Sequence, residues 1–160
     1  MLYEKKEITL KNGKTAVFRS PAPEEADEMM EYLRTCALET DFILRYPEEC
    51  SETNEQEAKY LQNLNDSENG IMIVCEVDKK IAGNCQIMFN RRIKTRHRAS
   101  VAIAIISEFW NLGIGTAMFL EMIEIAKKHG VTQLELEFVE GNERAKHLYE
   151  KMGFRVVAEK

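Results

Sequence analysis

The first third of the chain has apolar and polar positions in an order that predicts a β-hairpin followed by two helices. The Asn-Gly pair at 12–13 divides residues 3–19 into two runs with alternating apolar positions. Asn-Gly is a strong two-residue hairpin signal because both residues tolerate positive φ. Pro23 then opens a helix with acidic residues in its first turn, and a second helix is expected to begin at Ser51 or Thr53.

The middle of the chain predicts strands. Residues 71–77 and 81–89 form two of them, joined by a tight turn, and residues 101–106 form a third. This third run is apolar without alternation, which is typical of a central strand covered on both faces. A turn that contains glycine leads into a helix that ends at 129–130. Because 131–139 reads as a further strand, these elements form a strand–helix–strand unit with parallel pairing.

The end of the chain predicts one more helix and one more strand. Asn142 is a favourable N-cap, and the apolar residues that follow it recur at helical spacing. Gly153 ends this helix, and residues 154–157 begin a last strand. The pattern as a whole predicts a mixed α/β fold with a partly antiparallel sheet.

The composition is that of a folded domain without a nucleic-acid or membrane partner. Hydrophobic residues make up 44% of the 160 residues, and the formal net charge is −5. Proteins that bind nucleic acids or membrane surfaces usually present a basic surface, so an acidic balance argues against both. No apolar run approaches the ~20 residues of a membrane span, and the N-terminus lacks an apolar signal core. We therefore expect a cytoplasmic protein.

The cysteines and histidines predict no metal site. The cysteines show no C-x-x-C spacing, and no histidine pair completes a zinc pattern. A reducing compartment disfavours disulfides, so we expect small buried or half-buried thiols. The cysteines are Cys36, Cys50, Cys75 and Cys85.

The stretch from Trp110 to Thr116 is the first that could carry chemistry. It leads to a helix N-terminus, where unpaired amides and the helix dipole favour negative charge. Gly113 and Gly115 let the backbone approach a ligand closely. The combination predicts a phosphate or pyrophosphate cradle, although a turn that only packs helix on strand has the same pattern. A P-loop would need Gly-Lys-Ser/Thr, but Gly115 is followed by Thr116 and not by a lysine, and a dinucleotide fingerprint would need a small residue where Met118 stands.

A second motif follows the next strand, where residues 142–154 read NERAKHLYEKMGF. With the stretch from Trp110 to Thr116, it resembles the GNAT superfamily of acyl-CoA N-acyltransferases. The A region of that family looks like a strand, then Gln/Arg-x-x-Gly-x-Gly/Ala, then a helix. Its B region looks like Asn-x-x-Ala-x-x-Leu-Tyr-x-x-x-Gly-Phe. Both occur here in order, and the resemblance covers residues from about 15 to 157.

The resemblance implies a fold and a cosubstrate. The expected fold is α/β with an α+β mixed sheet: a GNAT-like, mostly antiparallel sheet with one splayed parallel strand pair and helices on both faces. It would form a single domain over residues 1–160. Acetyl-CoA is implied as the acyl donor, entering the wedge between the splayed strands, and no metal is implied.

The resemblance also assigns roles to the residues that match the family's motifs. The backbone of the central strand would pair with the pantetheine arm, amides of the following turn would hold the pyrophosphate, and Asn142 would bond the pantetheine or a linking water. Tyr149 would stand near the thioester sulfur and donate to the departing thiolate, although a core tyrosine would look the same. The expected cofactor-binding residues are Ile103, Ala104, Ile105, Asn111, Leu112, Gly113, Ile114, Gly115, Thr116 and Asn142.

A general base is expected on the strand before the second motif. An amine with a pKa near ~10.4 is almost fully protonated at pH 7, so a base is useful, directly or through water. Glu137 lies five residues before Asn142, where some family members that acetylate protein N-termini carry a base; a half-exposed strand face is the alternative. Ser100 stands where many relatives have Glu, and Trp110 stands where the motif often has Gln or Arg.

Two charged segments have more than one interpretation. Residues 91–98 contain five Lys or Arg and could contact nucleic acid, an acidic peptide or the 3′-phosphate of coenzyme A, or form a solvated loop. The acidic segment 47–52 could attract a cationic amine, or only keep the surface solvated.

These observations predict an acetyl-CoA-dependent N-acetyltransferase that acts on a small-molecule or peptide primary amine by direct attack in a ternary complex. Acetylation of protein N-termini or lysines is an alternative, and a non-catalytic acyl-CoA-binding module is another. Relatives usually follow the strand at Phe154 with a further hairpin strand, for which Lys160 leaves no room. A homodimer in which a neighbouring subunit completes the sheet is therefore also open.

Overall fold

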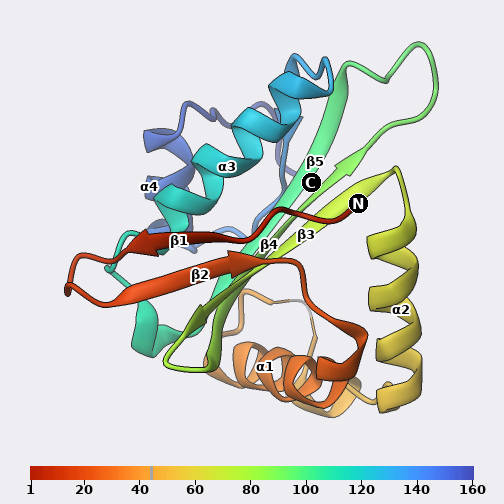
Figure 1. The fold of residues 1–160 in the computed structure, drawn as a ribbon. Coiled ribbons are helices and arrows are strands. Elements are labelled where there is room, and N and C mark those ends of the chain that lie inside the picture. The colour runs from red at the N-terminus through yellow and green to blue at the C-terminus, as the bar shows by residue number, and fades with distance from the viewer. Residues whose placement is uncertain (44) are drawn as a thin grey trace.

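Within residues 1–43 and 45–160, which the computed structural model describes, six strands form one sheet in the order β1-β2-β3-β4-β5-β6 (Figure 1). Neighbouring strands are antiparallel except β5 and β6, which are parallel. This confirms the predicted sheet. The strands are β1 (Lys6–Thr9), β2 (Thr15–Arg19), β3 (Gly70–Val77), β4 (Lys80–Phe89), β5 (Arg98–Ile105) and β6 (Gln133–Glu135).

Two tight turns set the antiparallel part of the sheet. Between β1 and β2, Gly13 has a φ of +84°, whereas Asn12 keeps a negative φ and accepts the Lys14 amide on its side chain at 3.0 Å. The hairpin is confirmed, with a single left-handed residue rather than two. Between β3 and β4, Asp78 and Lys79 both have positive φ, which is the turn geometry that matches the twist of the strands.

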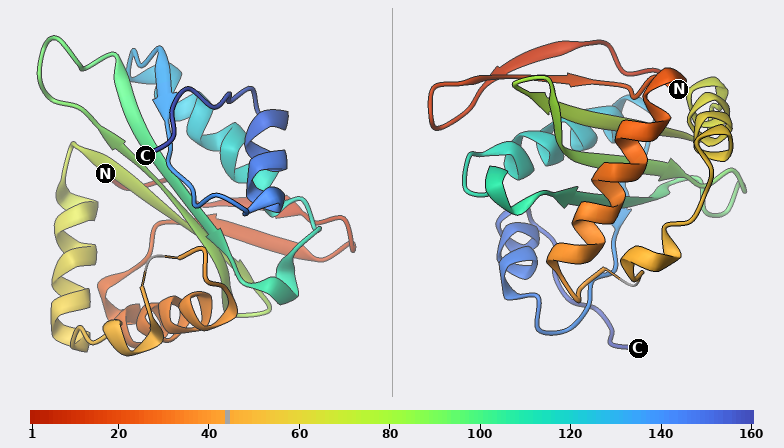
Figure 2. Two further views of the ribbon diagram at one scale, coloured as in Figure 1. Left: turned by 180° about the vertical axis from the view of Figure 1, so that it is seen from behind. Right: turned by 90° about the horizontal axis from the view of Figure 1, so that it is seen from below.

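Helices cover both faces of the sheet, α1 and α2 on one and α3 and α4 on the other (Figures 1 and 2). The second predicted helix begins after Thr53, not Ser51. The Thr53 side chain accepts from the Gln56 amide at 3.1 Å, and the Gln56 side chain accepts from the Thr53 amide at 2.8 Å. The helices are α1 (Ala26–Glu39), α2 (Asn54–Asp66), α3 (Ile114–Lys128) and α4 (Glu143–Lys151), with short 3₁₀ turns η1 (Pro23–Glu25), η2 (Pro47–Glu49) and η3 (Ser107–Phe109).

Each face of the sheet has its own apolar core. On one face the buried side chains of α3, including Phe119 and Met122, pack with strand residues such as Ile87. On the other face Met29 of α1 and Leu61 of α2 pack against β3 and β4. The four cysteines are buried and free, as predicted. The sheet is therefore fixed from both sides, which gives the end of β5 a rigid support.

The structure corrects two predictions about the strands of the parallel pair. Ala99 and Val101 are buried but Ser100 and Ala102 are exposed, so β5 alternates and is not covered on both faces. Small side chains made the run look uniformly apolar, but α1 and α2 do not cover this part of it. The strand predicted over 131–139 is confined to β6, because the chain leaves β5 after Glu135.

The predicted strand over 154–157 is also absent from the structure. Residues 154–160 have no regular secondary structure. The backbone groups of a strand need hydrogen-bond partners on a neighbouring strand. In the described part of the chain, no strand lies beside residues 154–157.

In the ranges that the structure describes, no helix is both long and apolar enough to cross a membrane. The same residues contain no group of three or more His, Cys, Asp or Glu side chains placed to hold a metal ion.

Candidate functional site

The parallel strands β5 and β6 separate after three residue pairs. The register pairs Arg98 with Gln133 and ends with Ser100 opposite Glu135. From there β5 continues to Ile105 while the other chain segment diverges toward α4 (Figures 1 and 2). The result is a wedge with one free strand edge, which matches the predicted splay.

Hydrogen bonds at the two ends of β5 show which backbone groups face this wedge. The carbonyl of His97, just before β5, accepts from the Gln133 amide on the β6 side at 3.1 Å. The amide of Ile106, just after β5, donates to the Ala82 carbonyl beside β4 at 2.9 Å. Because successive residues of a strand turn their backbone groups to alternate sides, the odd-numbered residues of β5 face the wedge.

The free edge therefore begins at the Val101 carbonyl, because the Val101 amide belongs to the last pair with β6, and it continues through Ile103 to Ile105. Ala104 turns its backbone groups toward β4, and its carbonyl also accepts from the Tyr32 hydroxyl at 2.9 Å. Of the predicted strand residues, Ile103 and Ile105 are placed at the wedge, and Ala104 is not. The alternation of the strand explains the difference, because adjacent residues cannot both face the same edge.

Trp110 closes the far end of the free edge. Its indole N–H donates to the Ile105 carbonyl at 2.8 Å. The Arg144 guanidinium of α4 lies 4.1 Å from the centre of the Trp110 ring, and it donates to Asn111 Oδ1 at 3.3 Å. These contacts connect the end of β5, the turn at residues 110–113 and the start of α4.

The N-terminus of α3 presents free amides beside these elements. Asn111 and Gly113 both have left-handed backbone, with φ of +62° and +89°. Asparagine and glycine are the residues that adopt this conformation most readily. The Ala117 amide makes the first intrahelical bond, to Gly113, at 3.1 Å. The amides of 114–116 precede it and have no intrahelical acceptor, so they form a concave row of donors.

Three cations surround these amides. Lys11 of the β1–β2 turn packs against the cradle, since a Cβ added to Gly113 would lie 3.6 Å from Lys11 Cε. The Lys151 ammonium donates to the Thr116 hydroxyl at 3.5 Å, and Arg144 lies on the other side. Among the described residues, none of the three has a carboxylate within 4.0 Å. This end of α3 therefore has the charge and donors for a di- or triphosphate-like anion.

Gly115 is the point where three elements meet. A Cβ added there would lie 2.9 Å from Leu148 Cδ2 of α4 and 3.5 Å from Ile105 Cδ1 of β5. Asn142 begins α4 and accepts from the Ala145 amide at 3.3 Å. Its side-chain oxygen is therefore occupied by the cap, which leaves the amide N–H groups of the side chain as donors.

Tyr149 stands on the α4 side of the wedge among aromatic rings. Its ring is 5.7 Å from Phe119 of α3 and 5.5 Å from Phe138, both edge to face. Burial raises the pKa of its phenol, so the hydroxyl stays protonated at neutral pH. In the described part of the chain this hydroxyl has no hydrogen-bond partner. Tyr149 is therefore a protonated phenol in an apolar setting.

Glu137 follows β6 and is exposed, with its carboxylate paired to the ammonium of Lys160. Glu135, two residues earlier, is held by Arg98 at 2.6 Å and by the Gln133 side chain at 2.8 Å. Of the two, Glu137 has the more weakly restrained carboxylate, because its one partner is a lysine on the exposed tail.

A polar network lies on the opposite side of β5, under α1 and α2. The hydroxyl of Tyr32 lies 2.7 Å from Asn84 Oδ1 and donates either there or to the Ala104 carbonyl. Tyr32 is fully buried, and burial raises the pKa of its phenol well above the ordinary value. Next along β4, the Gln86 side-chain amide donates to the Tyr60 hydroxyl of α2 at 3.4 Å.

Comparison with known proteins identifies the family to which this arrangement belongs. The model of the acetyltransferase (GNAT) family matches residues 27–154. The chain belongs to the GNAT family of acetyltransferases. A GNAT-family acetyltransferase from Streptococcus pneumoniae is 31% identical, with a TM-score of 0.81 over 89% of this chain and 86% of that one.

Two solved structures of lower sequence identity share the fold. A paiA N-acetyltransferase from Thermoplasma acidophilum, in complex with coenzyme A, is 18% identical, with a TM-score of 0.74 over 91% of this chain and 92% of that one. A ribosomal-protein-alanine N-acetyltransferase from Brucella melitensis is 21% identical, with a TM-score of 0.72 over 86% and 83% of the two chains.

The sequence motifs predict roles for residues around this wedge, and those roles stay predictions, but the motifs assign no role to the cations beside α3 or to the Tyr32 network. The segment 111–116 and Tyr149 lie around the wedge, and the Leu112 carbonyl accepts from the Lys11 amide at 3.1 Å. Arg144 and Lys151 lie within the second sequence motif, which assigned them no role. Their helical spacing puts both on the side of α4 that faces the N-terminus of α3, and this spacing could have indicated that they act together. Tyr32 gave no signal, because its partners lie far away in sequence.

Proposed function

We propose that this chain is an acetyl-CoA-dependent N-acetyltransferase that moves an acetyl group to a primary amine by direct attack in a ternary complex. The observation that carries the proposal is the free edge of β5 leading directly into the cationic N-terminus of α3. An extended amide chain that ends in a pyrophosphate needs a strand edge followed by an anion cradle. The two stand here in that order.

The residues of the wedge divide the binding between them. Backbone groups of Val101 and Ile103 would pair with the pantetheine amides, as a neighbouring strand would. The amides of 114–116 would hold the pyrophosphate, with Lys11 and Lys151 balancing its charge. Asn142 would donate to the pantetheine from its side-chain N–H groups. Bound there, acetyl-CoA supplies a thioester carbonyl at the narrow end of the wedge.

Glu137 and Tyr149 would move the two protons of the reaction. Glu137 would accept a proton from the incoming ammonium, directly or through water, which leaves a nucleophilic amine. As the new C–N bond forms and the C–S bond breaks, Tyr149 would donate its hydroxyl proton to the departing sulfur. The raised pKa of Tyr149 keeps that proton in place until it is needed. The second proton of the attacking nitrogen, lost as the amide forms, would return to the Tyr149 phenolate, directly or through water. Lys160 would leave Glu137 when a substrate ammonium arrives.

The proposal is tested by following thiol release from acetyl-CoA in the presence of a panel of primary amines. Small diamines, amino sugars and short peptides with free N-termini or lysines cover the main acceptor classes. Amine-dependent release with a matching acetylated product is the expected result. Binding of acetyl-CoA without release for any amine would instead support a non-catalytic acyl-CoA-binding module.

A further inference from the structure

The segment between β4 and β5 forms a basic surface at the end of the molecule remote from the wedge. We define the distal basic surface as the loop 91–96, with its exposed cations Arg91, Arg92, Lys94 and Arg96. Within the described residues none of these four has a carboxylate within 4.0 Å, whereas Arg98, the next cation, is paired with Glu135. The positive charges of the loop are therefore available to a partner.

The loop is an ordered structure that holds these cations in place. The Thr95 amide donates to the Arg92 carbonyl at 2.9 Å, and the Arg98 amide donates to the Thr95 carbonyl at 2.9 Å. The Thr132 amide, from the segment before β6, donates to the His97 carbonyl at 2.9 Å. Two turns and one bond to a neighbouring segment thus fix the backbone before any partner binds, which lowers the entropic cost of binding.

The charge of this surface contrasts with the rest of the chain. Residues 21–69, which include α1 and α2, contain 14 acidic and 3 basic residues, a net charge of −11. The remainder of the chain contains 13 acidic and 19 basic residues, a net charge of +6. The net negative charge of the chain therefore comes from residues 21–69, whereas the rest of the chain is positive. The positive field at the loop attracts anionic groups.

The loop cannot serve the proposed acyl-CoA site. Its Arg96 lines one hollow with His129 and Gly130 at the C-terminal end of α3, and Phe89, just before the loop, stacks on His129 with ring centres 4.6 Å apart. The anion cradle is at the other end of α3, and a helix of 15 residues is about 22 Å long. The 3′-phosphate of coenzyme A is therefore not the partner of these arginines.

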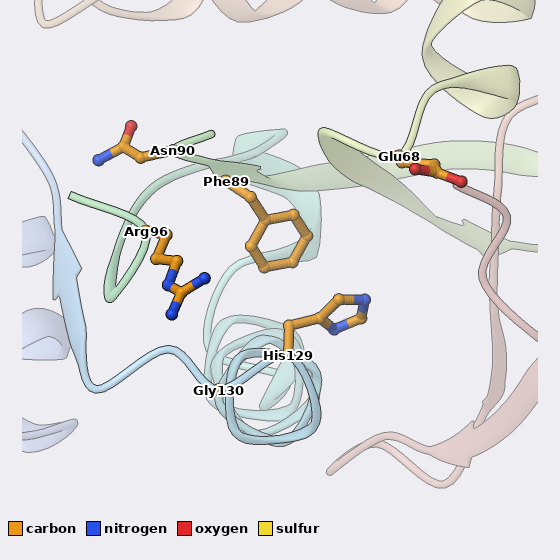
Figure 3. A pocket seen from close by; sticks show the side chains of 6 residues that line it. All are labelled: Glu68, Phe89, Asn90, Arg96, His129 and Gly130. Atoms are coloured by element: carbon orange, nitrogen blue, oxygen red, sulfur yellow. The ribbon is translucent and has the colours of Figure 1, made fainter. Parts of the chain in front are cut away.

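Next to the loop is a hollow of about 440 Å³ with an aromatic floor (Figure 3). The stacked rings of Phe89 and His129 line it on one side, and the Arg96 side chain extends toward it from the loop. Glu68 lies on the opposite rim. Ile93, at the tip of the loop, is 78% exposed. An apolar floor, an exposed isoleucine and several cations thus occur on one small surface.

We propose that the distal basic surface binds an acidic peptide segment that also carries apolar side chains. Its carboxylates would pair with the loop arginines, and its apolar side chains would contact Ile93 and the Phe89–His129 pair. A nucleic acid fits less well, because its continuous phosphate charge would meet the Glu68 rim and the acidic helix α2 beyond it. The surface would hold a protein partner or a protein acceptor at a second point, separate from the wedge.

The test is fluorescence anisotropy with a short labelled peptide of alternating Glu and Leu. Arg91→Glu/Arg92→Glu should weaken its binding roughly tenfold, since two favourable contacts become repulsive. Lys5→Glu/Lys59→Glu makes the same charge change at exposed positions elsewhere and should alter Kd less than about twofold. Raised salt should weaken binding to the unmodified chain, and Ile93→Ser should weaken it without a change of charge.

Three results would overturn the proposal: no binding of the Glu-Leu peptide by the unmodified chain, equal losses in the two double variants, or stronger binding of oligouridine than of the peptide. The last result would assign the surface to nucleic acid. Acetyl-CoA affinity of Arg91→Glu/Arg92→Glu should match that of the unmodified chain, which shows that the variant is folded. Because this site does not depend on the proposed acetyl transfer, each proposal can fail without the other.

Discussion

The Trp110 indole donates to the Ile105 carbonyl at 2.8 Å, and this bond marks where the free edge of β5 ends. It satisfies the last outward carbonyl of the strand, so the open backbone groups lie between Val101 and the Ile105 amide. The ring then supports the Arg144 guanidinium beside the α3 cradle. A tryptophan in place of Gln or Arg in the motif thus keeps the backbone site intact and positions a cation from α4.

Tyr149→Phe should lower kcat about 10²-fold while the KM for acetyl-CoA changes less than about twofold. The variant removes the proton donor but keeps the ring that packs on Phe119 and Phe138. Steady-state kinetics at saturating amine measure the split. Tyr3→Phe is the matched control, since it removes a phenol that bonds Glu121 away from the wedge. An unchanged kcat in Tyr149→Phe would remove this residue from the mechanism.

Glu137→Gln should lower kcat/KM at pH 7 by about 10²-fold. The loss should shrink as the pH approaches the pKa of the acceptor amine, near ~10.4 for a lysine-like amine, because less of the substrate then needs a base. A pH–rate profile of both forms tests this. Glu135→Gln, whose carboxylate is already held by Arg98, should have a smaller effect. A loss in Glu137→Gln that stays constant with pH would indicate a structural role.

Much of this site follows from the sequence because its signals are local. The Thr53 cap, the Asn142 cap and the glycine-containing turn before α3 depend on neighbours along the chain, so short patterns predicted them, although not the left-handed conformation of Gly113. The alternation that excludes Ala104 from the wedge depends on hydrogen bonds that His97 and Ile106 make with other strands. The end of β6 and the Tyr32 network likewise depend on tertiary contacts, which a local sequence pattern does not contain.

Gly113→Ala should destabilise the protein by about 1–2 kcal/mol, because a side chain at a φ of +89° is strained. Gly115→Ala should cost less, since its new Cβ would come too close only to the flexible end of Leu148 and would make an ordinary contact with Ile105. Urea unfolding of the two variants gives the comparison. If both lost the same stability, backbone conformation would not be the reason that glycine stands at 113.

Glu57→Gln should raise the Tm at pH 7. Glu57 is only 6% exposed, and burial, with a smaller contribution from Glu52, raises the pKa of its carboxyl. A raised folded-state pKa means that the native state loses stability as the pH rises through it, whereas below the unfolded-state pKa the group costs nothing. The Tm difference between the variant and the unmodified chain should therefore shrink as the pH falls toward about 4. A difference independent of pH would contradict this cause.

The most direct test of the account is a calorimetric titration of acetyl-CoA into the unmodified chain and two double variants. Arg144→Glu/Lys151→Glu reverses two exposed cations at the N-terminus of α3, and Lys127→Glu/Lys128→Glu makes the same change at its C-terminal end. The Kd should be at least about tenfold weaker for the first pair and nearly unchanged for the second. Absence of binding to the unmodified chain, or equal losses in both variants, would contradict it.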